Sequence, residues 1–212
     1  PSARSSPAAR TGTGKVSIPF AVADRRPASA SALVGSFLKL LEAAQGRFAA
    51  DEIFGLLGNE ALCAAFGISP DALPVLMTWV EESGIRWGAD ARTRSELGLP
   101  EDDRHTWRFG LERMLLGLAM DADGDELFAR LCPYGGVAGE VDDLVEGFAR
   151  FVDAVISLSV QIRTNRSPSA WAQWMREVAQ YFFVPRGMQV NEMQLLLRAV
   201  AGVARNAEQA HY

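Results

Sequence analysis

The sequence contains few of the side chains that most often perform catalysis or bind metals. Its 212 residues include only two histidines and two cysteines. Cys63 and Cys132 lack the spacing of a metal-ligand pair, and His105 has no serine or cysteine nearby that is arranged as a nucleophile. The acidic pairs at 102–103 and 142–143 are adjacent residues that point apart on a helix or loop. We therefore expect no catalytic residue, no metal site and no cofactor in this chain.

Lysine and long apolar runs are also scarce. Lys15 and Lys39 are the only lysines, and the net charge of −5 argues against a free-standing nucleic-acid binder. No run approaches the roughly 20 apolar residues that cross a bilayer, so we expect no membrane partner. Two cysteines without a partner pattern fit a cytoplasmic location. The first residue is Pro1 rather than Met, which indicates a segment of a longer protein.

The first 17 residues are mostly Ser, Ala, Arg, Gly and Thr, and we expect a flexible tail or linker there. Gly14-Lys15 resembles the end of a phosphate-binding loop. However, Ala9 stands where that loop needs glycine, and Val16 where it needs a hydroxyl group for magnesium. No nucleotide is therefore expected. Residues 17–23 are apolar and partly β-branched, which favours a strand or a short extended segment.

Apolar residues recur at helical spacing through the remainder of the chain, and this pattern predicts an all-α fold. Helices are expected at 32–41, 51–57, 59–66, 71–83, from 107 onwards, 141–162, from 168 onwards and from 191 onwards. The expected N-caps are Asp51, Asn59, Asp71, Thr106 and Ser167, with a capping box at Asn191 and Gln194.

The same periodicity predicts which side chains face the core. Met77, Leu115 and Val203 fall on the apolar stripes of their helices and are expected to be buried. Gly110 and Gly117 lie seven residues apart on one predicted helix, where they allow a neighbouring backbone to approach closely.

One segment has the outline of a DNA-reading helix pair. Residues 62–83 read helix, turn at Gly67, then helix. The second helix carries Asp71, Glu81 and Glu82 without a basic residue, so DNA phosphates would repel it. Simple helix packing is therefore favoured over DNA reading.

Arginine and aromatic residues occur together in three places, and these are the candidate partner or DNA contacts. "GIRWG" (84–88) and "HTWRFG" (105–110) pair an arginine with a tryptophan, while 161–186 interleaves four arginines with aromatic residues. Such pairs can stack on a partner or on single-stranded DNA, or they can hold the domain together. The candidate surface residues are Arg86, Trp87, Trp107, Arg108, Arg163 and Arg166.

Three motifs, in this order and spacing, resemble the RecC family. They are "IPFAVADR" (18–25), "WVEESGIRWG" (79–88) and "HTWRFGLERMLLGLAM" (105–120). RecC is the gamma subunit of bacterial exodeoxyribonuclease V, the RecBCD helicase–nuclease. The similarity begins near residue 18, and two departures are Ala21, where the family usually has serine, and Leu118, where it usually has an aromatic residue.

The resemblance implies a role without an active site. RecC resembles a superfamily-one helicase that has lost its ATPase motifs, and residues 18–212 would be a multi-helix, bundle-like insertion domain of that helicase-like protein. The family resemblance implies RecB-like and RecD-like subunits as partners, and DNA as a partner of the whole complex. Double-strand break repair, homologous recombination and Chi recognition would likewise belong to the complex or the whole subunit, whereas this segment would serve as a scaffold and docking domain.

Two other functions remain open from the sequence. An independent helical DNA-binding regulator predicts tight duplex binding with a steep salt dependence. A small helical enzyme predicts a deep pocket that contains titratable groups with shifted pKa values.

Overall fold

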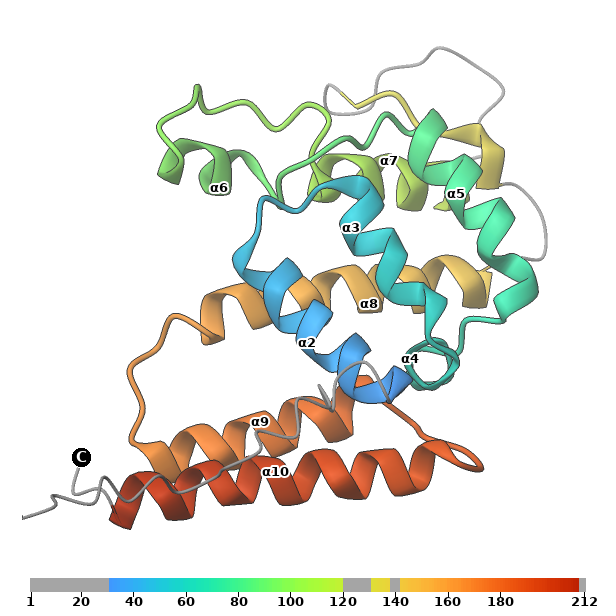
Figure 1. Ribbon diagram of the computed structural model, residues 1–212. Helices are drawn as coiled ribbons and strands as arrows, with labels where there is room; N and C mark the ends of the chain where they lie inside the picture. The colour runs from blue at the N-terminus through green and yellow to red at the C-terminus, as the bar shows by residue number, and fades with distance from the viewer. Residues whose placement is uncertain (1–30, 120–130, 138–141, 210–212) are drawn as a thin grey trace, which may run out of the picture.

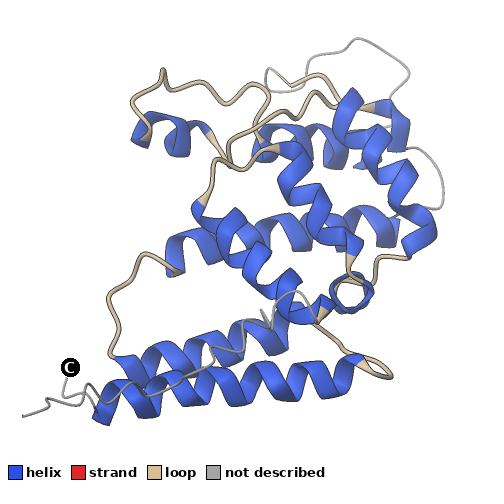
Figure 2. Cartoon of the chain, in the orientation of Figure 1, coloured by secondary structure: helices blue, strands red, loops and turns tan. Residues whose placement is uncertain are grey.

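A computed structural model describes residues 31–119, 131–137 and 142–209. Within these ranges the regular structure is helical, as Figure 2 shows, which confirms the all-α prediction. The expected extended segment at 17–23 and the Gly14-Lys15 pair lie outside the described residues. The α-helices are α2 (Ala32–Gln45), α3 (Ala50–Gly55), α4 (Glu60–Ala65), α5 (Leu73–Glu82), α6 (Ala91–Glu96), α7 (Trp107–Ala119), α8 (Asp142–Gln161), α9 (Pro168–Phe182) and α10 (Gln189–Gln209).

The helices pack around α8, which crosses the middle of the domain (Figure 1). One face of α8 is fully buried because its apolar residues recur every three or four positions. Phe148 packs edge-on against Trp107 of α7 with ring centroids 6.1 Å apart, and Phe151 does the same against Phe66 at 5.4 Å. Helices α9 and α10 form an antiparallel pair along one side of the domain (Figure 1). The core therefore joins early and late parts of the chain.

The first and last described helices are tied together by one carboxylate. Glu192 of α10 accepts hydrogen bonds from the Ser31 hydroxyl at 2.7 Å and from the backbone N–H of Leu33 at 2.9 Å. The Ser31 hydroxyl in turn accepts from Val34 N. A carboxylate at a helix N-terminus satisfies free N–H groups and complements the helix dipole. The start of α2 thus depends on α10.

The expected N-caps are confirmed at three helices. Asn59 accepts from the backbone N–H groups of Ala61 and Leu62, and Ser167 accepts from that of Ala170 with Pro168 at the first helical position. The hydroxyl of Thr106 also accepts from Phe109 N at 3.3 Å, as expected at the start of α7.

Three other helix starts were predicted wrongly. Helix α3 begins at Ala50 rather than after Asp51, because Ala50 N donates to the distant carbonyl of Arg86. A 3₁₀ turn at Pro70–Ala72 precedes α5, so Asp71 is not its N-cap. Gly187, in the left-handed region at φ +55°, lies in the turn that precedes α10. The helix starts at Gln189, before Asn191 and Gln194, which were expected to form its capping box.

Burial of three side chains was also predicted wrongly. Met77, Leu115 and Val203 are 51%, 43% and 56% exposed. On α5 the buried positions are Leu76, Trp79 and Val80, which share one face and turn Met77 towards solvent.

The expected close approach of a neighbouring backbone is confirmed at Gly117, whereas at Gly110 the neighbour is a side chain. A Cβ at Gly110 would overlap the side chain of Ile85, and a Cβ at Gly117 would overlap the backbone carbonyl of Tyr134. These glycines let the segments before and after α7 pack directly on its backbone.

Asn59 provides a test of how much one cap contributes to stability. Its amide oxygen accepts from α4, and its amide nitrogen donates to the Ser36 hydroxyl of α2 at 3.0 Å. We expect Asn59→Ala to lower the free energy of unfolding by about 1–2 kcal/mol, because a buried cap is lost. Asn59→Asp should retain most of this stability because its carboxylate still caps α4. Urea denaturation measures both, and equal losses would contradict the capping role.

Candidate interaction surface

Backbone hydrogen bonds hold together three loop segments that lie far apart in the sequence. They are residues 47–50, 86–89 and 105–108, which lie before α3, before α6 and around the start of α7. The donor–acceptor pairs are Ala50 N to Arg86 O, Gly88 N to Arg47 O, Arg86 N to His105 O, Trp107 N to Gly88 O, and Arg108 N to Ala89 O, at 2.9–3.0 Å. Because backbone groups make these bonds, the three segments form one fixed platform.

Arg94 of α6 holds the platform from within. It is 8% exposed, and its guanidinium donates to the carbonyls of Trp87 at 3.0 Å, Asp102 at 3.2 Å and Arg104 at 2.8 Å. The same guanidinium stacks 4.3 Å from the Trp87 ring. Gly88, at φ +86°, leaves the space that this arginine occupies, because a Cβ there would lie 3.1 Å from Arg94 Nε. Arg94 is therefore a structural arginine.

An exposed arginine also stacks on Trp87. The guanidinium carbon of Arg47 lies 5.2 Å from the Trp87 ring centroid, so the indole stacks with both Arg47 and Arg94. Arg86 and Arg108 are exposed on the same platform, and Arg108 approaches Asp90 at 3.9 Å. We call Arg47, Arg86, Trp87 and Arg108 the Arg–Trp edge.

The structure brings three of the six candidate residues to this edge. The fourth, Trp107, belongs to the same platform, but its side chain is fully buried and its indole N–H donates to Phe48 O at 3.0 Å. Its side chain therefore supports the surface from below. Arg47 and Arg94 were missed, since no spacing in the sequence relates them to Trp87.

Arg163 and Arg166 lie elsewhere, in the connection between α8 and α9. Arg163 pairs with Glu96 of α6 at 3.2 Å. Arg166 stacks on the rings of Trp171 and Trp174, with distances of 5.1 and 4.7 Å, and donates to Gln161 O at 2.6 Å. Both arginines thus already hold elements of the domain together.

The residues with the helix-turn-helix outline pack as ordinary helices. Leu76, Trp79 and Val80 of α5 are buried, while Glu81 and Glu82 are exposed. The exposed surface of α5 therefore presents carboxylates, which oppose binding of DNA phosphates.

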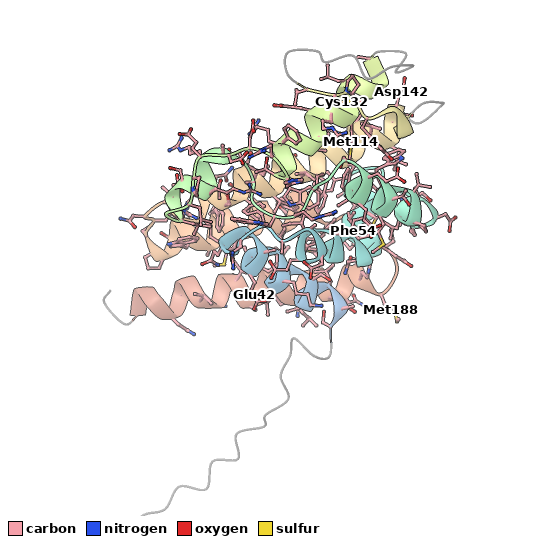
Figure 3. The ribbon with its side chains drawn as sticks, turned by 90° about the horizontal axis from the view of Figure 1, so that it is seen from above. Glu42, Phe54, Met114, Cys132, Asp142 and Met188 are labelled. Carbon is pink, nitrogen blue, oxygen red and sulfur yellow. The ribbon has the colours of Figure 1, made fainter. Side chains whose placement is uncertain are left out.

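Several titratable groups have shifted pKa values, each with a local cause. Burial raises the pKa of the Cys63 thiol, whose Sγ–H donates to Leu57 O. Burial and the hydrogen bond to Glu82 raise the pKa of Tyr134. The guanidinium of Arg113 in α7 donates to the Cys132 carbonyl at 2.8 Å, and Figure 3 labels Cys132 and Met114 of α7 in the same part of the view. These contacts hold loops against the core.

The ion pair of Asp102 and Arg104 makes a prediction about pH. Hydrogen bonds from Arg104, the closest at 2.6 Å, lower the pKa of Asp102 to about 2. Because this folded-state pKa lies below the ordinary value of 3.8, the pair stabilises the fold at higher pH and this contribution is lost as the pH falls towards 2. We expect Arg104→Ala to return the Asp102 pKa towards 3.8, measured by NMR titration of its carboxyl carbon. An unchanged pKa would contradict this cause.

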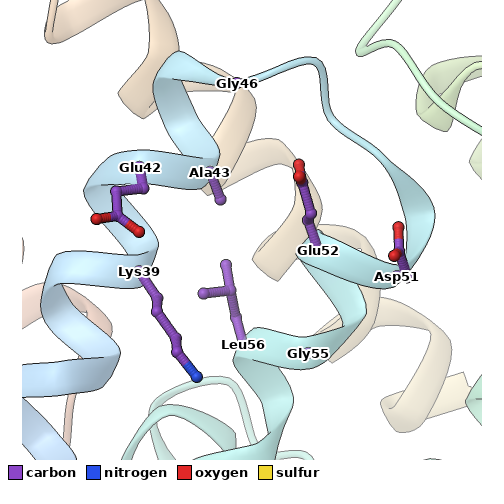
Figure 4. A pocket seen from close by; sticks show the side chains of 8 residues that line it. All are labelled: Lys39, Glu42, Ala43, Gly46, Asp51, Glu52, Gly55 and Leu56. Carbon is purple, nitrogen blue, oxygen red and sulfur yellow. The ribbon is translucent and has the colours of Figure 1, made fainter.

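A hollow of 350 Å³ lies between α2 and α3 (Figure 4). Figure 4 shows Leu56 at its centre, with Glu42 and Lys39 on one side and Asp51 and Glu52 on the other. No cluster of three or more His, Cys, Asp or Glu able to hold a metal ion occurs among the residues that the structure describes. In the same part of the chain, no helix is long and apolar enough to cross a membrane.

The sequence matches a known protein family. Residues 30–212 match the model of one domain of a larger protein. That model is the fourth domain of the RecBCD enzyme subunit RecC, and the chain belongs to the RecC family.

Individual relatives agree with the family match. The chain is 35% identical to RecBCD enzyme subunit RecC of Escherichia coli (strain K12) over 168 residues, which are 79% of this chain and 15% of that protein. It is 33% identical to the same subunit of Mycobacterium tuberculosis (strain ATCC 25618 / H37Rv) over 150 residues, 71% of this chain and 14% of that protein. The chain thus spans about 15% of the length of these relatives.

Proposed function

We propose that this domain is a non-catalytic scaffold through which a RecC-like subunit docks its partners. The whole complex would be an ATP-dependent helicase–nuclease that acts on DNA in double-strand break repair and homologous recombination, with Chi recognition performed by the whole subunit. Its RecB-like and RecD-like subunits would be the partners, and its location would be the cytoplasm. The relatives' own name, subunit RecC of the RecBCD enzyme, supports an assembly role.

The Arg–Trp edge is the observation that carries this proposal. Arginine and tryptophan are enriched among the residues that dominate binding energy at protein interfaces. Here Arg86 and Arg108 are exposed on a platform that backbone hydrogen bonds hold fixed, and Trp87 already stacks with Arg47 and Arg94. A surface whose side chains are held before binding loses less conformational entropy when a partner arrives.

Co-purification tests the docking function. Full-length subunit is co-expressed with RecB-like and RecD-like partners, with and without residues 31–209, and complex recovery is measured. Loss of the complex on deletion is expected, and unaltered assembly would contradict the proposal. Arg86→Glu combined with Arg108→Glu should weaken assembly at least about tenfold, because reversed charges oppose a complementary partner. Arg198→Glu on the exposed side of α10 is the control.

A DNA-binding titration of the chain alone distinguishes an independent DNA-binding regulator from a scaffold. That function requires duplex DNA binding by the 212-residue chain alone, with an affinity that falls steeply as salt increases. If the chain binds duplex DNA in this way and deletion of residues 31–209 does not affect complex assembly, the regulator function replaces the scaffold proposal.

A further inference from the structure

A groove of 470 Å³ runs between α8 and α9. On each wall, residues one helical turn apart form two adjacent rows, one apolar and one that carries the polar groups, as expected for the inner edge of a helix. The residues from α8 are Asp153, Ala154, Ser157, Leu158 and Gln161, and those from α9 are Trp174, Glu177, Val178, Tyr181 and Phe182. The groove is thus largely apolar and aromatic, with two carboxylates.

A hydrogen bond fixes the order of residues along the groove. Trp174 donates from its indole N–H to the Gln161 amide oxygen at 3.0 Å, so these residues face each other at one end. Because α8 and α9 are antiparallel (Figure 1), Glu177 faces the middle of the α8 wall, and Tyr181 faces the end that contains Asp153. With a rise of about 1.5 Å per residue, the two carboxylates are separated by about 6–8 Å along the groove axis.

The charge of the groove is negative. None of its lining residues is basic. In the described ranges, neither Asp153 nor Glu177 forms a salt bridge, and the hydrogen bond of Glu177 comes from the neutral amide of Gln173 at 3.0 Å. Two carboxylates over an apolar floor attract a cation and repel phosphate groups. The groove therefore suits a cationic side chain and opposes DNA.

Tyr181 supplies an aromatic face at the Asp153 end. Its side chain is 62% exposed, and Phe66 and Phe182 pack edge-on against it with centroid distances of 6.0 and 5.3 Å. The ring is thereby held in position while much of its surface contacts solvent. A guanidinium can lie flat on such a ring and donate to a carboxylate beside it, which an ammonium does less well.

This helix pair already contains one arginine that stacks on aromatic rings. At the opposite end, Arg166 stacks on Trp171 and Trp174, and one of its guanidinium nitrogens donates to the backbone carbonyls of Gln161 and Thr164. Among the described residues, no arginine lies over Tyr181. Among the described residues, an arginine of this chain therefore stacks on the aromatic side chains at the Trp174 end of the groove and not at the Tyr181 end.

We propose that the α8–α9 groove binds an arginine side chain from an apolar segment of a partner protein. The guanidinium lies on Tyr181 between Asp153 and Glu177, and the neighbouring apolar residue of the partner packs on Leu158 and Val178. This inference rests on the proposed docking function, but it concerns a surface separate from the Arg–Trp edge and specifies the chemistry of the bound segment.

NMR titration of the full 212-residue chain tests the groove directly. The probe is acetyl-leucyl-arginyl-leucine amide, and its neutral counterpart replaces arginine by citrulline, which has the same shape without the charge. We expect saturable shifts of the backbone amides that line the groove. The citrulline peptide should bind at least about tenfold more weakly, because it cannot form the ionic and cation–π contacts.

Variants then assign the binding to particular side chains. Asp153→Asn with Glu177→Gln, and separately Tyr181→Ala, should each weaken arginine-peptide binding at least about tenfold, whereas Tyr181→Phe should retain it. The matched control, Glu112→Gln with Asp142→Asn, removes the same charge from exposed positions outside the groove and should leave the affinity unchanged. Equal binding of the citrulline peptide, or equal loss in the control, would overturn the proposal.

Co-purification separates this proposal from the docking function. If deletion of residues 31–209 abolishes assembly while the peptide fails to bind, the groove proposal falls and the docking function stands. If the arginine peptide binds the groove but deletion leaves assembly intact, the docking function falls instead. Weaker assembly of the full-length subunit carrying Asp153→Asn and Glu177→Gln, without loss of stability, supports both.

Discussion

Replacing Trp107 by alanine is expected to lower the free energy of unfolding by about 3–5 kcal/mol, the range for truncation of a large buried aromatic side chain. Trp107 is fully buried, and its ring packs edge-on against Phe148 of the central helix. Alanine would leave a cavity between α7 and α8, and Phe48 O would lose the indole N–H that binds it at 3.0 Å. Chemical denaturation monitored by circular dichroism measures this loss.

Two variants separate the contributions of ring and hydrogen bond. Trp107→Phe keeps an aromatic ring but leaves the Phe48 carbonyl without its donor, and we expect a loss of about 1–3 kcal/mol. Arg108→Ala changes the exposed neighbour and should stay within about 0.5 kcal/mol of the original chain. A loss in Trp107→Ala no larger than in Arg108→Ala would show that Trp107 is not part of the core.

The second large effect is expected at Arg94. Arg94→Ala removes a buried guanidinium that binds three backbone carbonyls, and we expect a loss of about 2–4 kcal/mol, since hydrogen bonds from charged groups are the stronger ones. The damage should concentrate in residues 84–106, because two of these carbonyls belong to Asp102 and Arg104 and the third to Trp87. Hydrogen exchange should therefore show faster exchange there than in α8.

Charge and geometry can be separated at the same position. Arg94→Lys keeps the positive charge but cannot present the planar fork that reaches three carbonyls and stacks on Trp87, so it should recover less than half of the loss. Arg92→Ala on the same helix removes an 85% exposed arginine that pairs only with Glu96, and it should change stability by less than about 0.5 kcal/mol. Full rescue by lysine would show that charge alone matters.

Local signals in the sequence predicted the helices well, and tertiary contacts account for the errors. Asn59 and Ser167 were predictable as caps because their own side chains make the bonds. The start of α3 was not, because its N–H group binds the carbonyl of Arg86, which follows 36 residues after Ala50. Likewise, no neighbouring residue reveals that α2 is capped by Glu192.

The sequence named the candidate surface residues but not their arrangement. Arg86, Trp87 and Arg108 lie on one edge, which the two separate Arg–Trp motifs did not predict, and their role in binding a partner stays a prediction. The Arg–Trp motifs did not reveal that Trp107 is buried while Trp87 is partly exposed. Each tryptophan has an arginine next to it in the sequence, so the two motifs look alike. Periodicity was of little help here, since residues 86–90 lie in a loop whose path depends on Arg47 and Arg94.

The bond between Ser31 and Glu192 also has a consequence for biosynthesis. A gap of 161 positions separates the two residues, so α2 leaves the ribosome long before its capping carboxylate has been translated. Until then, water must solvate the N–H group of Leu33, and the apolar side of α2 that α10 covers lacks its neighbour. The nascent domain therefore closes only when α10 emerges, and products terminated before α10 would expose this apolar surface to chaperones and proteases.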